Sequence, residues 1–419
     1  METKLDIAAQ VTKDTATTNI PFKVCMHVRG VARTDGRVMR EASALSEAGF
    51  DLSIIDVEGE RSLPTEEHIC GIKVKHIIRP DWFISPRFKP WILVRTLQKL
   101  IYSTLQLIRT PADIYHAHDL TALPACYIAA QFHRTALIFD AHELPLQALE
   151  GSLWYRFRKL FAYILAIIIS RCAGVITVSP PIAQEIRSHY HPLDVSLIRN
   201  VPLYQTVSRS DRLRQYLGLG PDVRIALYQG NLQADRGLDR LIHAASFLEP
   251  DIVIVMMGKG IGATQSQLEA LIVSEGVADR VKIIPAVPYA ELLHWTASAD
   301  VGLIIYSPDL SLNVRMCLPN KLFEYLMAGL PVLASPLDAV VDVLNTYDVG
   351  QIISSLTPTE IGTSINTVLA DRVALDRMHN NALKAVQREL CWEEESRFLL
   401  QLYQDIVSKR SMAYRARMA

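Results

Sequence analysis

Long apolar runs are missing from this sequence, and neither sign of charge is in excess. No segment offers the roughly 20 consecutive apolar residues that a membrane-spanning helix needs. The 43 Lys and Arg residues are balanced by 44 Asp and Glu residues, so the formal net charge is −1. Without a basic excess the composition gives no electrostatic support for binding nucleic acid. We therefore expect neither a membrane span nor a nucleic-acid partner.

Closely spaced cysteines are also missing. The sequence has 6 cysteines and no C-x-x-C pair, which favours reduced thiols over a disulfide framework or a zinc site. This usage predicts a cytoplasmic protein. Residues 1–20 are polar and lack the apolar core of a signal peptide, so we expect a flexible tail there. The cysteines are Cys25, Cys70, Cys126, Cys172, Cys317 and Cys391.

What the sequence does contain is an ordinary globular balance, with 419 residues of which 50% are hydrophobic and 21% charged. This length predicts two or three domains with cores of their own. The chain twice opens a unit with a short apolar strand, a glycine-containing loop and a helix. The first unit has strand Lys23–Val28, loop 29–36, helix Arg37–Ala48 and strand Asp51–Val57; the second has strand Arg224–Gln229, loop 230–237 and a helix from Leu238. Rossmann-like domains begin in this way.

Further strands alternate with helices in both halves, which predicts an α/β protein with parallel, doubly wound sheets. We expect a first domain over 21–202, a hinge at Asn200–Pro202 and a second domain over 203–391. A last helix over 392–408 returns to the first domain, and 409–419 form a loose basic tail. The expected strands are Ile72–Ile78, Asp113–His116, Ala136–Asp140, Gly174–Ser179, Val253–Met257, Val281–Pro285, Asp300–Tyr306 and Val332–Ala334.

Polar side chains follow two predicted strands of the first domain. His118 and Asp119 follow one strand, and His142 and Glu143 follow the next. Ligands of open α/β sheets bind at the carboxyl ends of strands, so these residues are candidates for a site. A buried histidine satisfied by neighbours is the alternative for each ring. We expect the rings of His116 and His118 to point to opposite faces, and therefore not to share a metal.

The stretch 318–335, LPNKLFEYLMAGLPVLAS, predicts a short helix followed by a strand. Leu322, Tyr325 and Leu326 form an apolar face, Pro319 suits the first helical position, and Gly329 ends the helix. Lys321 and Glu324 then lie in its first turns. The free N–H groups and partial positive charge of a helix start suit a bound anion. An ordinary helix with a surface ion pair is the alternative.

This stretch resembles the signature of retaining nucleotide-sugar glycosyltransferases of family 4, which have the GT-B fold of two Rossmann-like domains facing each other across a cleft. The resemblance implies that Glu324 holds the ribose hydroxyls of the donor. It also implies that a cation and main-chain amides near Asn320, Lys321 and Leu322 receive the diphosphate. The family often has a second glutamate eight residues before the first, where this chain has Met316. Asn313, Arg315 and Asn320 are the nearby polar candidates to replace it.

The same resemblance extends over most of the chain. In the loop after Gly230 the family usually has an arginine and a lysine, where this chain has Asn231 and Arg236. Arg236 keeps a cation able to contact phosphate. The loop with Val287 resembles the one that frames the nucleotide base. The segment DGRVMREASALSEAGFDLSII resembles the family's first unit, which implies that Gly30 and Arg33 lie near the active site.

We therefore expect catalytic roles for three residues, His118, Arg236 and Lys321. The resemblance matches His118 to a histidine near the transferred sugar. The expected acceptor-side residues are Arg33, Asp119, His142 and Glu143; the expected donor-side residues are Gly30, Gly230, Asn231, Arg236, Val287, Asn320, Lys321, Leu322 and Glu324.

The predicted function is transfer of a sugar from a nucleoside diphosphate, UDP or GDP, to a hydroxyl of a glycan or lipid-linked acceptor. Glycan, polysaccharide or glycolipid biosynthesis would use such an enzyme. The cations and helix start supply positive charge at the leaving group, so we expect no cofactor and no metal. An epimerase or hydrolase of the same fold, and a non-catalytic nucleotide-sugar-binding subunit, are the alternatives.

Two stretches of the first domain, Trp82–Ala112 and Gly151–Gln184, contain no acidic residue. In the first, Arg95, Lys99, Ser103 and Gln106 share a polar arc of a helix, and the cations Arg87 and Lys89 lie upstream of it. The opposite arc of this helix is apolar and consists of Leu93, Leu97, Leu100, Ile101 and Ile108. In the second stretch, Arg156, Arg158 and Lys159 precede the apolar run Leu160–Ile169. Two readings stay open: core helices with solvated basic ends, or a face that touches an anionic membrane at the cytoplasmic side.

Overall fold

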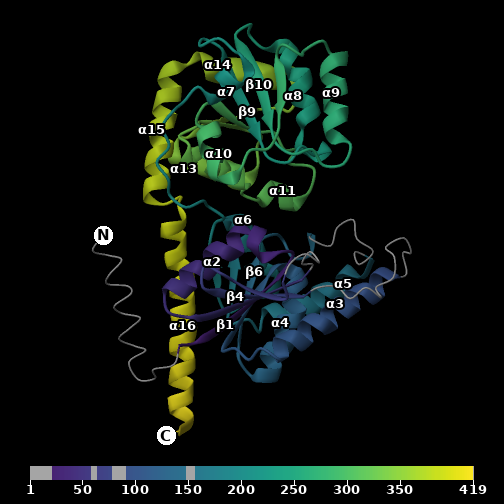
Figure 1. Ribbon diagram of the computed structural model, residues 1–419, viewed down its shortest axis with the longest axis vertical. Helices are drawn as coiled ribbons and strands as arrows, with labels where there is room; N and C mark the ends of the chain where they lie inside the picture. Colours follow the sequence, from purple (N-terminus) through teal and green to yellow (C-terminus); the bar gives the residue numbers. More distant parts are fainter. Residues whose placement is uncertain (1–20, 58–63, 78–90, 148–155, 419) are drawn as a thin grey trace. The chain divides into compact units, whose positions relative to one another are not determined.

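The computed structural model describes residues 21–57, 64–77, 91–147 and 156–418. The chain divides into two compact units (Figure 1). Unit 1 comprises the chain up to Ile198 together with Ser396 onward, and unit 2 comprises Arg199–Glu395. The sequence placed these divisions at 202 and 391. The predicted N-terminal tail, residues 1–20, lies outside the described residues.

Unit 1 is built on an eight-stranded sheet in the order β3-β4-β2-β1-β5-β6-β7-β8. The predicted parallel arrangement is confirmed for all strands except β3, which pairs antiparallel with β4 at one edge. The short edge strands β3 and β8 were not predicted from the sequence. The strands are β1 Lys23–Arg29, β2 Asp51–Val57, β3 Glu66–Ile69, β4 Ile72–Ile77, β5 Ile114–His118, β6 Ala136–Ala141, β7 Gly174–Thr177 and β8 Val195–Leu197.

The helices of unit 1 cover the sheet in two layers. Right-handed crossovers that move from β4 through β5, β6 and β7 to β8 place α3, α4, α5 and α6 on one face. The crossover from β1 to β2 runs the other way and places α2 on the opposite face. The helices are α2 Gly36–Glu47, α3 Trp91–Ile108, α4 Asp119–His133, α5 Arg158–Ile169 and α6 Pro180–Tyr190.

The last helix, α16, runs from Trp392 to Met418. The predicted loose tail over 409–419 is therefore wrong as far as Met418. No glycine or proline occurs between these bounds, so nothing in the sequence stops the helix. From Ser396 onward α16 belongs to unit 1, where Arg410 Nη1 donates a hydrogen bond to the Asp113 carbonyl.

Unit 2 is built on a fully parallel six-stranded sheet in the order β11-β10-β9-β12-β13-β14. Numbered within the unit this is the order 3-2-1-4-5-6 of a dinucleotide-binding Rossmann fold. The strand β10 is apolar and buried throughout, which is usual where helices cover both faces of a parallel sheet. The strands are β9 Arg224–Gln229, β10 Ile252–Met257, β11 Val281–Ile284, β12 Val301–Ile304, β13 Val332–Ala334 and β14 Gly350–Ile352.

The helices of unit 2 complete the α/β alternation predicted from the sequence. None of the helices in the described part of the chain is both long enough and apolar enough to cross a membrane. The helices of unit 2 are α7 Arg212–Leu217, α8 Leu238–Ala244, α9 Thr264–Ser274, α10 Tyr289–Thr296, α11 Leu312–Met316, α12 Asn320–Met327, α13 Asp338–Tyr347, α14 Pro358–Ala370 and α15 Arg372–Arg388.

Candidate functional site

The candidate donor site of unit 2 lies where the strand order reverses. β9 and β12 are neighbours, yet the chain leaves them toward opposite sides of the sheet. Open α/β sheets bind ligands outside the carboxyl ends of two such strands. Here those ends carry Gln229 and Gly230 from β9 and Tyr306 just after β12.

Gly230 allows the chain to pass close to the start of α12. Its φ is +123°, a conformation that side chains rarely adopt, and a Cβ added there would lie 3.3 Å from Lys321 Nζ. Gly237 closes the same loop with φ +70°, where a Cβ would lie 2.2 Å from the Ile305 carbonyl oxygen. The loop between them is therefore fixed against both β12 and α12.

Lys321 and Arg236 converge on the same aromatic ring. Lys321 Nζ lies 3.6 Å from the Tyr228 centroid and 5.2 Å from the Tyr306 centroid, and Arg236 Cζ lies 4.8 Å from the Tyr306 centroid. Lys321 is only 7% exposed, and its ammonium has no hydrogen-bond partner among the described residues. The alternative of a surface ion pair is therefore wrong for Lys321.

The surroundings of Lys321 disfavour its charged form. Burial lowers its pKa well below the usual value, the Arg236 guanidinium lowers it further, and Glu324 acts in the opposite direction. Arg236 is itself partly exposed, and Gln233 Oε1 accepts from its Nη2 at 3.2 Å. An anionic group placed between Lys321 and Arg236 would favour the protonated lysine.

Glu324 lies one helical turn from Lys321 and is held by β9. Gln229 Nε2 donates to Glu324 Oε2 at 2.6 Å, and Gln229 Oε1 accepts from Thr296 Oγ1 at 2.7 Å. This chain of hydrogen bonds fixes the side chain of Gln229, which in turn fixes one carboxylate oxygen. The carboxylate can accept further hydrogen bonds from hydroxyl groups of a ligand.

Helix α12 begins one residue later than predicted. Pro319 is its N-cap, with ψ 140°, and Asn320 is the first helical residue. The predicted apolar face of Leu322, Tyr325 and Leu326 is confirmed, since all three side chains are fully buried. The Leu322 side chain thus lies in the core, and its amide donates to the Pro319 carbonyl at 2.9 Å. Asn320 is exposed and accepts a hydrogen bond from Asn200.

The other donor-side candidates lie on loops of unit 2. Asn231 is exposed and its carbonyl accepts from the Tyr228 hydroxyl at 2.9 Å. Val287 is partly exposed between β11 and α10. Met316 ends the short helix α11, where the neighbouring Arg315 pairs with Asp338 at 3.0 Å.

Asp140 organises the candidate site of unit 1, at the carboxyl end of β6. Arg37 of α2 donates to both of its carboxylate oxygens at 2.8 Å. His142 Nε2 lies 2.8 Å and His118 Nδ1 lies 3.2 Å from Asp140 Oδ2. His118 and Asp140 are fully buried, whereas the His142 side chain is 22% exposed. His142 is therefore the more accessible of the two imidazoles that Asp140 holds.

His116 and His118 lie on the same face of β5, contrary to the expectation from the sequence. Their rings stack with centroids 4.3 Å apart and planes inclined by 16°. Residues two apart on a strand share a face because the side-chain period of a strand is two residues. His116 Nδ1 lies 2.7 Å from the Tyr403 hydroxyl of α16, and its Nε2 lies 3.7 Å from Glu41 Oε2.

The ionisable side chains of this buried cluster differ in their charge states. Burial alone would raise the pKa of Asp140, but Arg37 and His142 hold it well below its usual range. Burial would likewise lower the pKa of His142, yet Asp140 and Asp119 raise it to about 10. The pKa of Glu41 is raised, first by burial and then by the neighbouring Asp140. The arrangement favours a charged Arg37–Asp140–His142 group beside a neutral Glu41.

A metal ion would meet competition in this cluster. Ligand atoms of Glu41, His116, His118 and Asp140 lie within 4.8 Å of one another, a spacing that a cation could use. However, Arg37 Nε lies 3.0 Å from Glu41 and 2.8 Å from Asp140. The guanidinium already neutralises Asp140 and would repel a second cation.

The remaining candidates of unit 1 lie near this cluster or at the end of β1. Asp119 has φ +64°, and its carboxylate lies 3.3 Å from His142 Nδ1. Glu143 is exposed. Gly30 donates its amide to the Val57 carbonyl at 2.8 Å. Arg33 forms an ion pair with Glu67 of the edge strand β3.

Sequence reasoning missed several residues that hold these groups. Arg37 and Glu41 lie on a helix whose apolar face was the only signal considered, although two ionisable residues four apart in a helix can contact each other. Tyr228, Gln229 and Tyr306 belong to apolar strand patterns. Their position at strand ends could have identified them.

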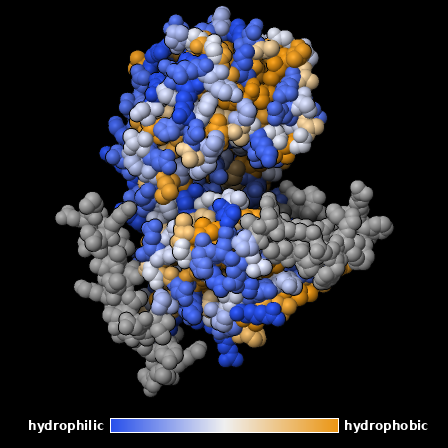
Figure 2. Space-filling view, in the orientation of Figure 1, coloured by the Kyte–Doolittle hydropathy of each residue, from blue (hydrophilic) through white to orange (hydrophobic). Residues whose placement is uncertain are grey.

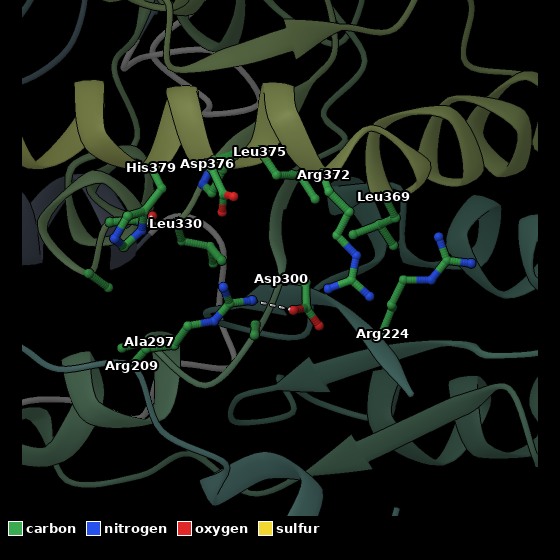
Figure 3. A pocket seen from close by; sticks show the side chains of 14 residues that line it. Arg209, Arg224, Ala297, Asp300, Leu330, Leu369, Arg372, Leu375, Asp376 and His379 are labelled. Carbon is green, nitrogen blue, oxygen red and sulfur yellow. Dashed lines mark hydrogen bonds and ion pairs between the residues drawn. The ribbon is translucent and has the colours of Figure 1, made fainter. Parts of the chain in front are cut away.

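A separate cavity lies at the amino ends of the unit 2 strands, the ends opposite to the candidate donor site (Figure 3). Its lining includes Arg224, Asp300 and Pro331 from the starts of β9, β12 and β13. Arg209 and Arg372 also line it. Its volume of about 50 Å³ is far below the roughly 300–1,000 Å³ of small-molecule sites. Asp300 pairs there with Arg209 at 2.6 Å and with Arg214 at 2.5 Å, which makes this a structural ion-pair network.

Comparison with known families matches each half of the chain. Residues 36–201 match the family described as Glycosyltransferase Family 4. Residues 210–385 match the family described as Glycosyl transferases group 1.

The curated relatives are distant. A D-inositol 3-phosphate glycosyltransferase of Paenarthrobacter aurescens is 24% identical over 397 residues, which is 88% of this chain and 91% of the relative. One from Xylanimonas cellulosilytica is 26% identical over 211 residues, so that the match spans about half of each protein, 50% of this chain and 49% of the relative.

Solved structures share the fold. Sucrose-phosphate synthase from Thermosynechococcus elongatus has a TM-score of 0.76 at 16% identity, covering 93% of this chain and 100% of that chain. Anabaena HepE, in a crystal structure with UDP and glucose, has a TM-score of 0.68 at 14% identity, covering 92% of this chain and 100% of that chain.

Proposed function

This chain belongs to the family 4-like glycosyltransferases of the GT-B fold, and we propose that it transfers a sugar from a nucleoside diphosphate to a hydroxyl acceptor with retention of anomeric configuration. The observation that carries the proposal is the convergence of Lys321 and Arg236 at the carboxyl ends of β9 and β12. Unit 2 would therefore hold the donor.

These two cations suit the chemistry of the leaving group. Breaking the sugar–phosphate bond leaves the diphosphate more negative and builds positive charge on the sugar. Cations fixed before the reaction stabilise that charge without reorganisation. Lys321 is held in a site that disfavours its charge, so the arriving diphosphate would restore its proton and gain a strong contact. In this proposal Arg236 adds a planar guanidinium that can donate to two phosphate oxygens.

Glu324 would hold the ribose of the donor. Two ribose hydroxyls can donate to one carboxylate, and Gln229 keeps that carboxylate in place. A ribonucleotide such as UDP or GDP is therefore the proposed carrier. UDP is the first candidate to test, because HepE was crystallised in complex with UDP and glucose.

Unit 1 would receive the acceptor, a glycan or a lipid-linked hydroxyl. His142, Asp119, Glu143 and Arg33 are the proposed acceptor-side residues, with His118 behind His142. The two curated relatives described above are named for inositol 3-phosphate, which makes a phosphorylated polyol another acceptor to test. We propose catalysis without a cofactor or metal. The unpaired cysteines support a cytoplasmic location. Peripheral contact with an anionic membrane is a separate part of the proposal.

Calorimetric titration with UDP, GDP and TDP, followed by their sugars, tests the donor. Transfer assays with an acceptor panel, and NMR of the product's anomeric proton, test the reaction and its stereochemistry. Product formed equally well without an acceptor would favour a hydrolase or epimerase. Donor binding without any turnover would favour a non-catalytic subunit.

A further inference from the structure

Helix α3 of unit 1 is rotated from the orientation predicted from the sequence, so that its buried side chains include Ser103, Thr104 and Leu107. Leu97 and Ile101 belong to the apolar arc predicted from the sequence, yet they are 53% and 50% exposed. Ser103, on the polar arc, is only 4% exposed, and Lys99 and Gln106 of the same arc are half-buried. A surface helix of a soluble protein usually turns its whole apolar arc toward the core.

The same exposure continues on the neighbouring helices of this layer. α3 packs against α4 (Figure 1). Arg171, which follows α5, donates a hydrogen bond from Nη1 to the Tyr127 hydroxyl of α4 at 2.6 Å. We call the exposed hydrophobic side chains of these helices the outer apolar face; Figure 2 shows part of it in orange over the α3–α4 region. It consists of Val94, Leu97, Ile101, Tyr102, Leu105, Ile128, Phe132, Phe157, Leu160, Tyr163 and Ile164.

Basic residues adjoin the outer apolar face at the start of α5. Arg156, Arg158 and Lys159 are exposed and alternate with the exposed Phe157 and Leu160. The described part of α3 and all of α5 contain no acidic residue. Cations beside inserted aromatic and aliphatic side chains are typical of helices that lie in the interface of an anionic bilayer.

We propose that the outer apolar face of α3, α4 and α5 inserts into the interface of an anionic lipid bilayer. Clustered exposed apolar side chains rimmed by polar residues mark protein or membrane interaction sites, whereas single ones do not. A second copy of the chain is the less suitable occupant, because pairing this face with itself would bring two sets of Arg156, Arg158 and Lys159 together. The bilayer satisfies both the apolar and the basic side chains.

The structure changes the expected mode of attachment. The cations weighed from the sequence were Arg87, Lys89, Arg95 and Lys99 of the first acid-free stretch, and Arg156, Arg158 and Lys159 of the second. Arg87, Lys89 and the side chains of Leu93 and Arg95 lie outside the described residues, and Lys99 is half-buried. Attachment would therefore depend on apolar insertion, with Arg156, Arg158 and Lys159 adding an electrostatic part. Salt should weaken such binding without abolishing it.

Vesicle flotation of the full chain tests the proposal without any donor or acceptor. Wild type should float with phosphatidylglycerol–phosphatidylcholine vesicles, and should retain part of its binding when salt rises from about 50 to about 500 mM. Replacing two inserted side chains with glutamate, as Leu97→Glu with Ile101→Glu or Leu160→Glu with Tyr163→Glu, should lower the partition coefficient at least about tenfold.

A matched control adds the same charge elsewhere. Val273 and Val373 of unit 2 are 76% and 78% exposed, so Val273→Glu with Val373→Glu should float like wild type. Absence of wild-type flotation at low salt, or equal flotation of the glutamate variants, would overturn the proposal. A wild-type dimer that the glutamate variants convert to monomer, without vesicle binding, would identify a self-interface instead. Donor titrations without vesicles keep these outcomes separate from the proposed transferase function.

Discussion

The Nζ atom of Lys321 lies 3.6 Å from the centroid of the Tyr228 ring and makes no hydrogen bond to any described residue. A buried ammonium in this position loses its hydration and recovers only part of that cost from the two aromatic rings. A cost of this kind is retained at functional sites more often than in a core. The burial of Lys321 against Tyr228 therefore suggests that this lysine lowers the stability of the folded protein and serves to bind an anion.

Replacing Lys321 with methionine should stabilise the protein while impairing donor use. The folded-state pKa of Lys321 is lowered, so between that value and the unfolded value of about 10.4 the unfolded chain binds more protons. Removing the lysine should raise Tm by about 2–4 °C at pH 7, the shift that roughly 1 kcal/mol produces in a domain of this size. The difference from wild type should narrow as pH rises toward 10.

Thermal scans at several pH values, with and without UDP, measure this effect. UDP should raise Tm of wild type more than Tm of Lys321→Met, because the ligand's diphosphate needs the ammonium. The exposed Lys384 of α15 gives a matched control. Lys384→Met should change neither the Tm without UDP nor the rise in Tm that UDP causes. A lower Tm for Lys321→Met at pH 7 would contradict the prediction.

Glu324 and Arg236 should affect the reaction in different ways. Glu324→Ala and Arg236→Ala should each lower kcat/KM by on the order of 10²-fold or more, a usual effect of losing one electrostatic contact at a site of developing charge. Arg236→Ala should act mainly on kcat, because its contact strengthens as the diphosphate leaves. Steady-state kinetics over a range of donor concentrations separates kcat from KM.

The exposed surface of unit 2 supplies controls for both variants. Glu269→Ala on α9 and Arg388→Ala on α15 remove the same charges away from the site and should leave the kinetics unchanged. Near-wild-type kcat/KM for Glu324→Ala or Arg236→Ala would show that the role given to that residue is wrong.

Local sequence patterns were sufficient to predict most of the fold. The helix–strand stretch from Asn320 to Ala334 has an apolar period, a stopping glycine and an apolar strand, and all three occur in the structure. Edge strands β3, β8 and β14 were missed because they are short and partly polar, as exposed edges tend to be. The helical continuation of α16 was missed because a basic composition was given more weight than the absence of a stopping residue.

The contacts within the sites could be predicted only in part. Lys321, Arg236 and Glu324 were identified by spacing and resemblance, but their partners Tyr228, Tyr306 and Gln229 come from other elements. Such pairings depend on how strands are ordered in the sheet, which local periodicity does not encode. The Arg37–Asp140 pair, 103 residues apart in the sequence, was missed for the same reason.

His142 should make stability depend on pH in the alkaline range. Its folded pKa is raised to about 10, against about 6.5 when unfolded, because Asp140 and Asp119 outweigh the effect of burial. The stability that this charge contributes is fully present below about pH 6.5 and is lost as pH rises through about 10. Urea unfolding of wild type and His142→Gln should therefore differ most near pH 6 and least near pH 10.

NMR of the imidazole protons measures the pKa of His142 directly. Asp140→Asn should move the His142 titration toward lower pH, because it removes the buried negative charge. The exposed His68 serves as the matched control, since His68→Gln should leave the pH dependence of unfolding unchanged. A His142 signal that titrates near 6.5 in the wild-type protein would contradict the assigned charge.

Sugar transfer should survive removal of metal ions. The proposed leaving-group site relies on Lys321 and Arg236 for positive charge, a task that a divalent ion would otherwise perform. Turnover after dialysis against EDTA should match that of the untreated protein.

The group of residues most able to contradict this prediction lies in unit 1, where Glu41, His116, His118 and Asp140 have the spacing of a metal site. Arg37 competes for both carboxylates there, so the purified chain should hold no stoichiometric zinc. Turnover lost to EDTA and restored by magnesium or manganese, or zinc that Glu41→Gln removes, would show that this cluster binds a metal.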